Sequence, residues 1–142
     1  METKPPVDDY VLYADDDPDD QMILSESFAQ YAQDKKLETV SSGDELLAYL
    51  GANIRSKGRP CLIILDQNMP GSTGDQVLQI LKTNEWYRDI PVVMFSTSTV
   101  MHIDLLKQYD VSMEIKPAKY SEWQKLAVTL LGHCDRFRRE AV

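Results

Sequence analysis

Five short apolar runs, separated by segments with helical spacing, constrain the fold of this chain more than any other feature. The runs are Tyr10–Ala14, Leu37–Ser41, Cys61–Leu65, Val92–Phe95 and Val111–Ile115. Runs of four or five residues rich in Val, Ile, Leu and Tyr are typical of strands buried in a parallel sheet. The alternation therefore predicts an α/β domain, and right-handed crossovers place helices on both faces of its sheet.

Apolar residues three and four positions apart predict five helices between and after these runs. Helix by helix, the residues expected to be buried are Leu24, Phe28, Tyr31 and Ala32; Leu46, Leu47, Leu50 and Ile54; Val77, Leu78 and Leu81; Val100, Ile103 and Leu106; and Trp123, Leu126, Ala127, Leu130, Leu131, Cys134 and Phe137. We expect one domain over residues 1–142, with a core over about 8–132 and a last helix that extends to about residue 139.

The charge balance excludes two classes of partner. The chain of 142 residues has 15 basic and 23 acidic residues, a net charge of −8 that disfavours direct binding to nucleic acid or to anionic lipid. The sequence has neither a signal peptide nor an apolar run near the roughly 20 residues that span a bilayer. We therefore expect a cytoplasmic protein without membrane contact.

The two cysteines lie far apart and have no metal-ligand spacing. Cys61 and Cys134 belong to no CxxC pair and to no Cys/His cluster. The sequence thus argues against a disulfide framework and a zinc site, and we interpret Cys61 as a small strand residue and Cys134 as a helix-face residue.

Acidic residues follow the first and third runs, where parallel strands present their carboxyl ends. They are Asp15, Asp16, Asp17, Asp19 and Asp20 after the first run and Asp66 after the third. If the strand order is 2-1-3-4-5, these two strands are neighbours and their terminal carboxylates converge. Several carboxylates close together require a cation, and oxygen ligands without His or Cys favour Mg²⁺, with Mn²⁺ as a second possibility.

The fourth and fifth runs end in a hydroxyl and a lysine, Ser96 and Lys116. A carboxylate nucleophile, a metal, a lysine and a hydroxyl together suit phosphoryl transfer. Asp66 is the predicted nucleophile because it ends the most apolar run and precedes an open turn, residues 69–74.

These residues, in this order, resemble the receiver domain of two-component response regulators. Val11–Asp17 is similar to the first strand and acidic pair of that family, and Leu65–Gly71 followed by Gly74 is similar to its phosphoacceptor loop. Ser96 and the Lys116-Pro117 pair match its hydroxyl and lysine positions. The resemblance covers nearly the whole chain and implies a flavodoxin-like (βα)5 fold with strand order 2-1-3-4-5. Because nothing after the last helix resembles an output domain, it implies a stand-alone receiver.

The resemblance also implies a mechanism and a set of partners. Asp66 would accept a phosphoryl group from a sensor histidine kinase or a histidine phosphotransfer protein, in a self-catalysed transfer rather than as an enzyme acting on other substrates. Asp16 and Asp66 would bind Mg²⁺ directly, the main-chain carbonyl of Asn68 would add a ligand, and Asp15 would act through water. A downstream protein or a second copy of the chain would read the face of the fourth and fifth helices.

The phosphoryl oxygens would be held by Ser96 and by the backbone N–H of Thr97, while Lys116 would pair with Asp66 or with the phosphate. A cis Lys116–Pro117 bond would direct the lysine into the site. Three positions depart from the family pattern. Met113 stands where Tyr or Phe is usual, Thr97 stands where Ala or Gly is common, and the polar Gln67 stands where an apolar residue is common.

Alternative interpretations remain open at this point. Asp17, Asp19 and Asp20 are explained by capping a helix that starts at Pro18. A phosphatase with an aspartate nucleophile would usually have a second Asp two residues on, where this chain has Asn68. A flavodoxin-like cofactor site is disfavoured by the acids after the first run. The remaining alternative is a pseudo-receiver that binds partners without phosphate.

Overall fold

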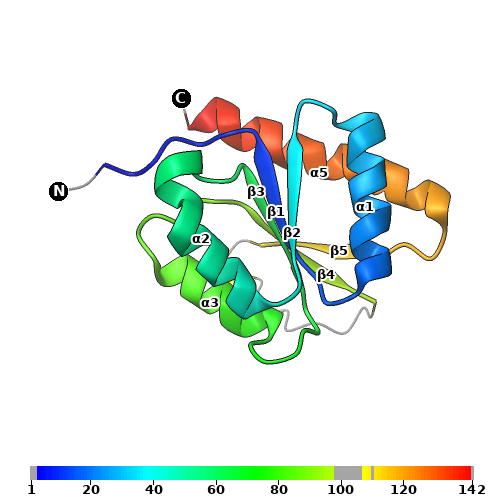
Figure 1. The fold of residues 1–142 in the computed structure, drawn as a ribbon, viewed down its shortest axis with the longest axis horizontal. Helices are drawn as coiled ribbons and strands as arrows, with labels where there is room; N and C mark the ends of the chain where they lie inside the picture. Colours follow the sequence, from blue (N-terminus) through cyan, green and yellow to red (C-terminus); the bar gives the residue numbers. More distant parts are fainter. Residues whose placement is uncertain (1–2, 98–106, 110, 142) are drawn as a thin grey trace.

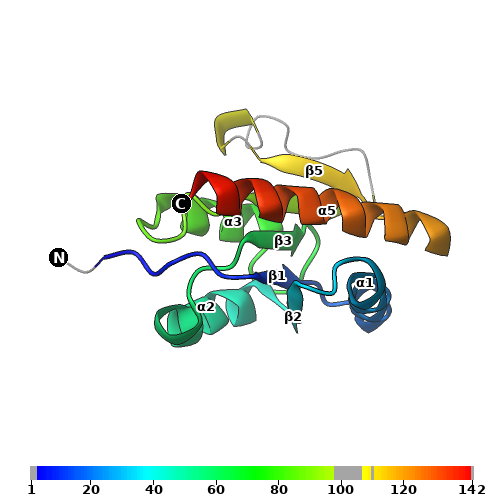
Figure 2. The ribbon, with the colours of Figure 1, turned by 90° about the horizontal axis from the view of Figure 1, so that it is seen from above.

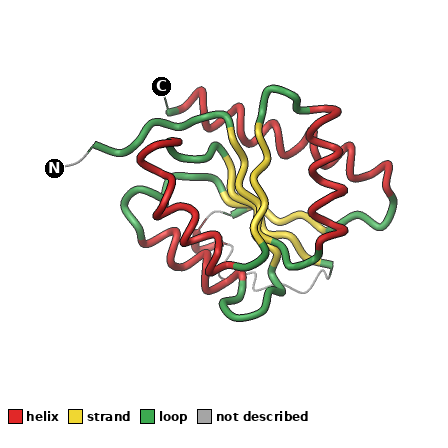
Figure 3. The backbone as a smooth tube through the Cα atoms, in the orientation of Figure 1, coloured by secondary structure: helices red, strands yellow, loops and turns green. Residues whose placement is uncertain are grey.

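A single parallel sheet forms the centre of the molecule. The computed structural model describes residues 3–97, 107–109 and 111–141. Its strands are β1 (Tyr10–Ala14), β2 (Lys36–Val40), β3 (Leu62–Asp66), β4 (Val92–Ser96) and β5 (Ser112–Ile115). They pair in the order β2-β1-β3-β4-β5, all parallel, and run side by side through the middle of the molecule (Figure 3). The predicted fold class and strand order are confirmed, and each predicted strand is correct to within one residue at either end.

Helices cover both faces of this sheet. The described helices are α1 (Pro18–Tyr31), α2 (Gly43–Lys57), α3 (Gly74–Thr83) and α5 (Tyr120–Glu140), and residues 107–109 are also helical. Helices α1 and α5 lie on one face, and α2 and α3 lie on the other (Figures 1 and 2). The residues predicted for the fourth helix, Val100, Ile103 and Leu106, lie outside the described residues.

Each face of the sheet has its own hydrophobic core, because successive strand residues point to opposite faces. Val11 and Tyr13 of β1 pack with Phe28 of α1 and Trp123 of α5. Leu12 and Ala14 instead belong to the cluster that α2 and α3 complete. The stripes predicted for the described helices α1, α2, α3 and α5 are buried or half-buried, with one exception. Tyr31 is 42% exposed, because it ends α1 and its hydroxyl donates to Gln124 Oε1 of α5 at 3.1 Å.

The start of α1 follows the capping pattern expected from the sequence. Asp17 is the N-cap and accepts a hydrogen bond from Asp19 N at 2.9 Å, and Pro18 is the first helical residue. This bond satisfies one of the N–H groups that a helix start leaves unpaired. The helix therefore begins directly beside the carboxyl end of β1.

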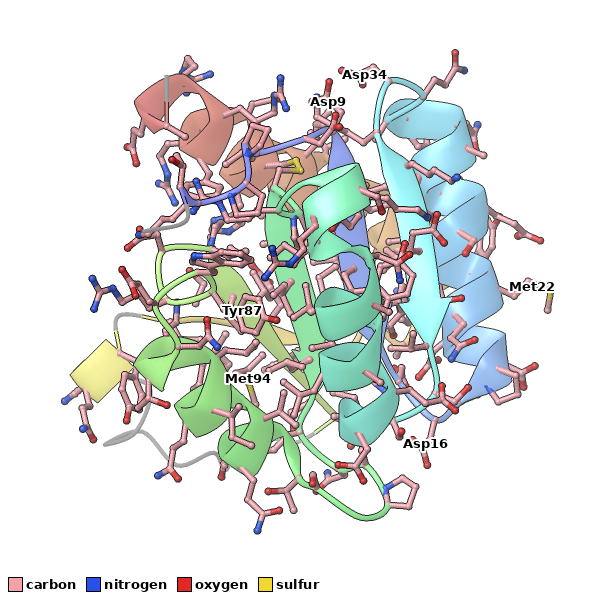
Figure 4. All side chains as sticks on the ribbon, turned by 60° about the vertical axis from the view of Figure 1, so that its left-hand side comes forward. Asp9, Asp16, Met22, Asp34, Tyr87 and Met94 are labelled. Carbon is pink, nitrogen blue, oxygen red and sulfur yellow. A yellow bond between two sulfur atoms is a disulfide. The ribbon has the colours of Figure 1, made fainter. Side chains whose placement is uncertain are left out.

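The two cysteines form a disulfide, so the prediction that they are unpaired is wrong. Cys61 and Cys134 are fully buried and their Cα atoms lie 4.7 Å apart (the bond is yellow in Figure 4). Cys61 lies at the amino end of β3 and Cys134 lies in the second half of α5. Packing of α5 across the sheet brings together residues that are 73 positions apart, which no local spacing reveals.

No described helix is both long enough and apolar enough to span a bilayer.

Candidate functional site

Three carboxylates meet at the carboxyl ends of β1 and β3. Ala14 pairs with Leu65 in the sheet, so Asp15 and Asp66 follow directly in neighbouring strands. One carboxylate oxygen from each of Asp15, Asp16 and Asp66 lies within 4.8 Å of the other two. Asp15 and Asp66 are buried, whereas Asp16 is exposed and closes the group on the solvent side. The predicted convergence of these strand ends is therefore present in the structure.

Lys116 faces these acids from the end of β5. Ser96 pairs with Ile115, and Lys116 N donates to the Ser96 carbonyl at 2.8 Å, which places the lysine beside the end of β4. Its Nζ lies 2.8 Å from Asp15 Oδ2, 2.9 Å from Asp20 Oδ2 and 3.5 Å from Asp66 Oδ2. The Lys116 side chain is only 8% exposed, so one buried ammonium is shared by three carboxylates.

Hydrogen bonds fix the positions of the two buried acids. The Tyr13 hydroxyl donates to Asp15 Oδ2, and Asp17 N donates to Asp15 Oδ1 at 2.9 Å. The amide of Gln21 donates to the Asp15 carbonyl, which ties the start of α1 to the end of β1. Asn68 N donates to Asp66 Oδ1 at 3.2 Å. The carboxylates are thus held in place before any ligand binds.

Burial and mutual repulsion control the charges of the site. Burial, followed by the charge of Asp15, raises the pKa of Asp66 to about 7, and Lys116 acts in the opposite direction. Burial alone would lower the pKa of Lys116, but its hydrogen bonds to Asp15 and Asp20 hold it well above the usual value. Burial, followed by the charge of Asp15, also raises the pKa of Tyr13. Lys116 is therefore a permanent cation, and Tyr13 is a neutral donor.

The arrangement fits a divalent cation. Asp15, Asp16 and Asp66 offer oxygen ligands within 4.8 Å of one another, and Asp20 adds a fourth carboxylate beside Lys116. Four carboxylates against one ammonium leave an excess of negative charge that repels itself at this range. Hard oxygen ligands of this kind suit Mg²⁺ or Mn²⁺. The donor set therefore matches the metal site that the sequence predicts.

The other predicted site residues lie in the loops at the same edge of the sheet. Ser96 is the last residue of β4 and is 1% exposed, and the exposed Thr97 follows it. Asn68 is exposed in the loop after β3. This loop lies close to α3, because a Cβ atom on Gly74 would be 2.7 Å from the Asp66 carbonyl oxygen and 2.8 Å from the Met94 methyl group. Only glycine allows α3 to start this close to the acidic site.

Sequence reasoning missed two residues of the site. The sequence predicts only a capping role for Asp20, yet its carboxylate also accepts a hydrogen bond from Lys116 Nζ. The sequence predicts only a strand position for Tyr13, although its place two residues before Asp15 puts both side chains on one face of β1. One further expectation is wrong: no described peptide bond is cis, including the Lys116–Pro117 bond. Met113, at the position where the family usually has an aromatic residue, is 39% exposed on β5.

Comparisons with known proteins agree with this geometry. The family model of the response regulator receiver domain matches residues 11–125. The two-component response regulator ARR6 of Arabidopsis thaliana is 31% identical over 104 residues, which are 68% of this chain and 56% of that protein. This chain thus spans little more than half the length of that relative.

Two solved structures have the same fold. The phosphorylated cyanobacterial phytochrome response regulator RcpA superposes with a TM-score of 0.75 at 28% identity, covering 84% of this chain and 88% of that one. The Mn²⁺-bound form of response regulator Rcp1 gives a TM-score of 0.73 at 26% identity, covering 84% and 89%. With the family match over most of its length and the acidic site at the strand ends, this chain belongs to the response regulator receiver domain family.

Proposed function

We propose that the chain is a phosphorylation-controlled signalling module in which Asp66 is the phosphoacceptor. The observation that carries the proposal is the position of Asp66. It is buried at the end of β3, grouped with Asp15 and Asp16, and 3.5 Å from Lys116 Nζ. The phosphoryl donor is a phosphohistidine of a sensor histidine kinase or a histidine phosphotransfer protein.

In the transfer, an Asp66 carboxylate oxygen attacks the phosphorus of the phosphohistidine. The new O–P bond forms an acyl phosphate as the N–P bond breaks, and the electron pair of that bond returns to the imidazole of the donor. Lys116 neutralises the phosphoryl oxygens, while the Ser96 hydroxyl and the Thr97 N–H donate hydrogen bonds to them. The chain supplies the acceptor and the positioning, so the transfer is self-catalysed and does not make the protein an enzyme for other substrates.

A divalent cation, Mg²⁺ or Mn²⁺, completes the site. Asp16, Asp66 and the main-chain carbonyl of Asn68 would hold it directly, with Asp15 acting through water. When bound, the cation offsets the negative charge of the carboxylates and of the incoming phosphoryl group. The Mn²⁺-bound form of response regulator Rcp1 supports this assignment, because a relative of the same fold holds such an ion.

Phosphorylation would change the charges around Lys116. A phosphoryl group adds acceptor oxygens and between one and two negative charges, so it competes with Asp15 and Asp20 for the lysine. The rearrangement would be read by a downstream protein or by a second copy of the chain at the face that includes α5. Both the kinase and this partner would meet the protein in the cytoplasm.

The intact mass after incubation with acetyl phosphate tests the acceptor role. We expect a gain of one phosphoryl group that requires Mg²⁺ and is absent in Asp66→Asn. Asp19→Asn is the matched control, because it removes an exposed carboxylate from the same acidic run. Normal labelling of Asp66→Asn would refute the assignment. Absence of labelling in every variant, with a cognate donor as well as acetyl phosphate, would favour a phosphate-independent interaction module.

A further inference from the structure

A cavity with a cationic lining lies at the end of the molecule opposite the acidic site. It has a volume of about 300 Å³, and Lys4, Arg59 and Arg138 contribute to its wall without any acidic side chain. Its lining residues include Lys4 to Val7 of the N-terminal segment, and Arg138 and Ala141 at the end of α5. These two parts of the chain lie next to each other in Figure 1. Arg138 Nη1 donates to the Val7 carbonyl at 2.8 Å, which holds these two parts of the chain together.

Arg59 is the unusual residue of this cavity. It is only 9% exposed, and its Nε donates to the Pro5 carbonyl at 2.8 Å. No carboxylate of the described residues lies within ion-pair distance of it, and no described residue accepts a hydrogen bond from its two terminal nitrogens. Its guanidinium carbon lies over the ring of Phe137, 5.8 Å from the ring centroid.

The other well-buried cations of the described chain are compensated differently. Lys35 contacts Asp9, Asp34 and Asp135, and Lys116 contacts Asp15, Asp20 and Asp66. Asp89 is near enough for its charge to interact with that of Arg59, but it forms its ion pair with Lys4 at 2.7 Å and not with Arg59. Arg59 therefore has the charge and the unused donors of an arginine that receives an anion from outside the chain.

The two other cations would strengthen such a site. Arg138 donates to Val7 and pairs with Asp9 at 2.9 Å, and Lys4 pairs with Asp89 at 2.7 Å. Both are already placed by these partners, so little side-chain freedom is lost when an anion binds. Asp9 and Asp89 offset part of the positive charge, but three donor groups around one cavity suit the several oxygens of a phosphate better than the two of a carboxylate, which one arginine can match alone.

We propose that this cavity binds the phosphate group of a small phosphorylated metabolite. The guanidinium of Arg59 provides a planar pair of donors for two phosphate oxygens, and Lys4 and Arg138 supply further N–H donors for the others. A volume of about 300 Å³ is at the lower end of the range for ligand sites, which favours a compact ligand. The site lies at the amino ends of the strands, so it is separate from the phosphoacceptor Asp66.

Binding would also fix the N-terminal segment. Arg59 N donates to the Pro6 carbonyl at 2.7 Å, and Asp8 N donates to the Arg59 carbonyl at 2.9 Å. An anion between Lys4 and Arg59 would hold the segment on these hydrogen bonds. Slower hydrogen exchange at the amides of Asp8 and Arg59 is therefore a second signal of binding, measured separately from the calorimetric dissociation constant.

Calorimetric titration of the native protein with inorganic phosphate, at constant ionic strength and in EDTA, tests the proposal. We expect saturable binding of one phosphate per chain, weakened at least about tenfold in Arg59→Gln. Lys4→Gln should weaken it about threefold, and because Lys4 lies on the N-terminal segment this change leaves the core intact. Arg55→Gln is the matched control, since Arg55 stacks over Trp86 at 5.1 Å and does not line the cavity.

The outcomes separate this site from general charge attraction and from the acidic site. Saturation that is lost in Arg59→Gln and kept in Arg55→Gln supports the proposal, and so does slower exchange at Asp8 and Arg59. If Arg59→Gln fails to fold, weaker binding in Lys4→Gln decides in favour. Absence of saturation, equal loss in Arg55→Gln, or binding that survives in Arg59→Gln and is lost in Lys116→Gln would each overturn it.

Discussion

Lys35 and Lys116 each contact three carboxylates, but in the described part of the chain only the carboxylates around Lys35 have a second cation beside them. Lys35 joins Asp9, Asp34 and Asp135, and Arg138 adds a second cation by pairing with Asp9. Lys116 has no second cation among the described residues, and Asp16 adds a further carboxylate to its group. Figure 4 places Asp9 and Asp34 together at one end of the molecule and Asp16 at the other. The carboxylates around Lys116 therefore keep an excess of negative charge, and it is this group that fits a divalent cation.

The raised pKa of Asp66 predicts how stability depends on pH in the absence of metal. The pKa is about 7 in the folded protein against 3.8 for a free side chain, so the folded state holds a proton that the unfolded state releases. The contribution of Asp66 to the free energy of unfolding is fully present below about pH 4 and is lost as the pH rises towards about 7. We expect the native protein in EDTA to lose about 2 kcal/mol more between pH 5 and pH 8 than Asp66→Asn. Urea unfolding at the two pH values measures this, and equal losses in both proteins would contradict it.

Removal of the Lys116 charge should destabilise the protein strongly without metal. Lys116→Gln leaves Asp15 and Asp66 buried without their cation, which costs about 3 kcal/mol. Because a divalent cation offsets the same carboxylates, Mg²⁺ should reduce the loss. Urea unfolding in EDTA and in Mg²⁺ measures both effects, with the exposed Lys119→Gln as control. A Lys116→Gln protein as stable as the native one in EDTA would show that the carboxylates do not need the lysine.

At the level of elements, sequence predicted the strands far better than the contacts between distant segments. Each strand is an apolar run that local composition reveals, and the acids of the site follow those runs directly. The exposure of Tyr31 depends on where α1 ends against α5, and the Lys116–Asp20 pair depends on how β5 lies beside α1. Those contacts arise from packing between elements, which residue spacing does not encode.

The Cys61–Cys134 disulfide links the amino end of β3 covalently to α5 and should stabilise the fold. It closes a loop of 73 residues, and the loss of chain entropy in the unfolded state corresponds to about 4 kcal/mol of stabilisation. We expect dithiothreitol to lower the melting temperature of the native protein. The control is Cys134→Ser, which has no disulfide, so the reductant should leave its melting temperature unchanged. If both cysteines can be alkylated in protein that was unfolded without any reductant, the two cysteines are not bonded to each other.

The arginines of the chain lie at the end of the strands opposite the acidic group of Asp15, Asp16 and Asp66. Every arginine of the chain belongs to segments at the amino ends of the strands: Arg55, Arg59, Arg88, Arg136, Arg138 and Arg139. The acidic group of Asp15, Asp16 and Asp66 and the run before α1 lie at the opposite end. The parallel sheet produces this separation, because all of its carboxyl ends lie on one side. A net charge of −8 therefore does not describe either end by itself.

The acidic end should make the stability of the whole protein depend on divalent cations. A ligand that binds only the folded state stabilises it by about 2.7 kcal/mol at one hundred times its dissociation constant. We expect Mg²⁺ to raise the melting temperature of the native protein in proportion to the logarithm of its concentration, once the site is occupied. Asp16→Asn removes an exposed ligand without disturbing the core, so it should abolish most of this increase. Asp19→Asn changes the net charge equally and should keep the increase, because Asp19 lies outside the metal group. Equal loss in both variants would show that Mg²⁺ screens the acidic end and does not bind at Asp15, Asp16 and Asp66.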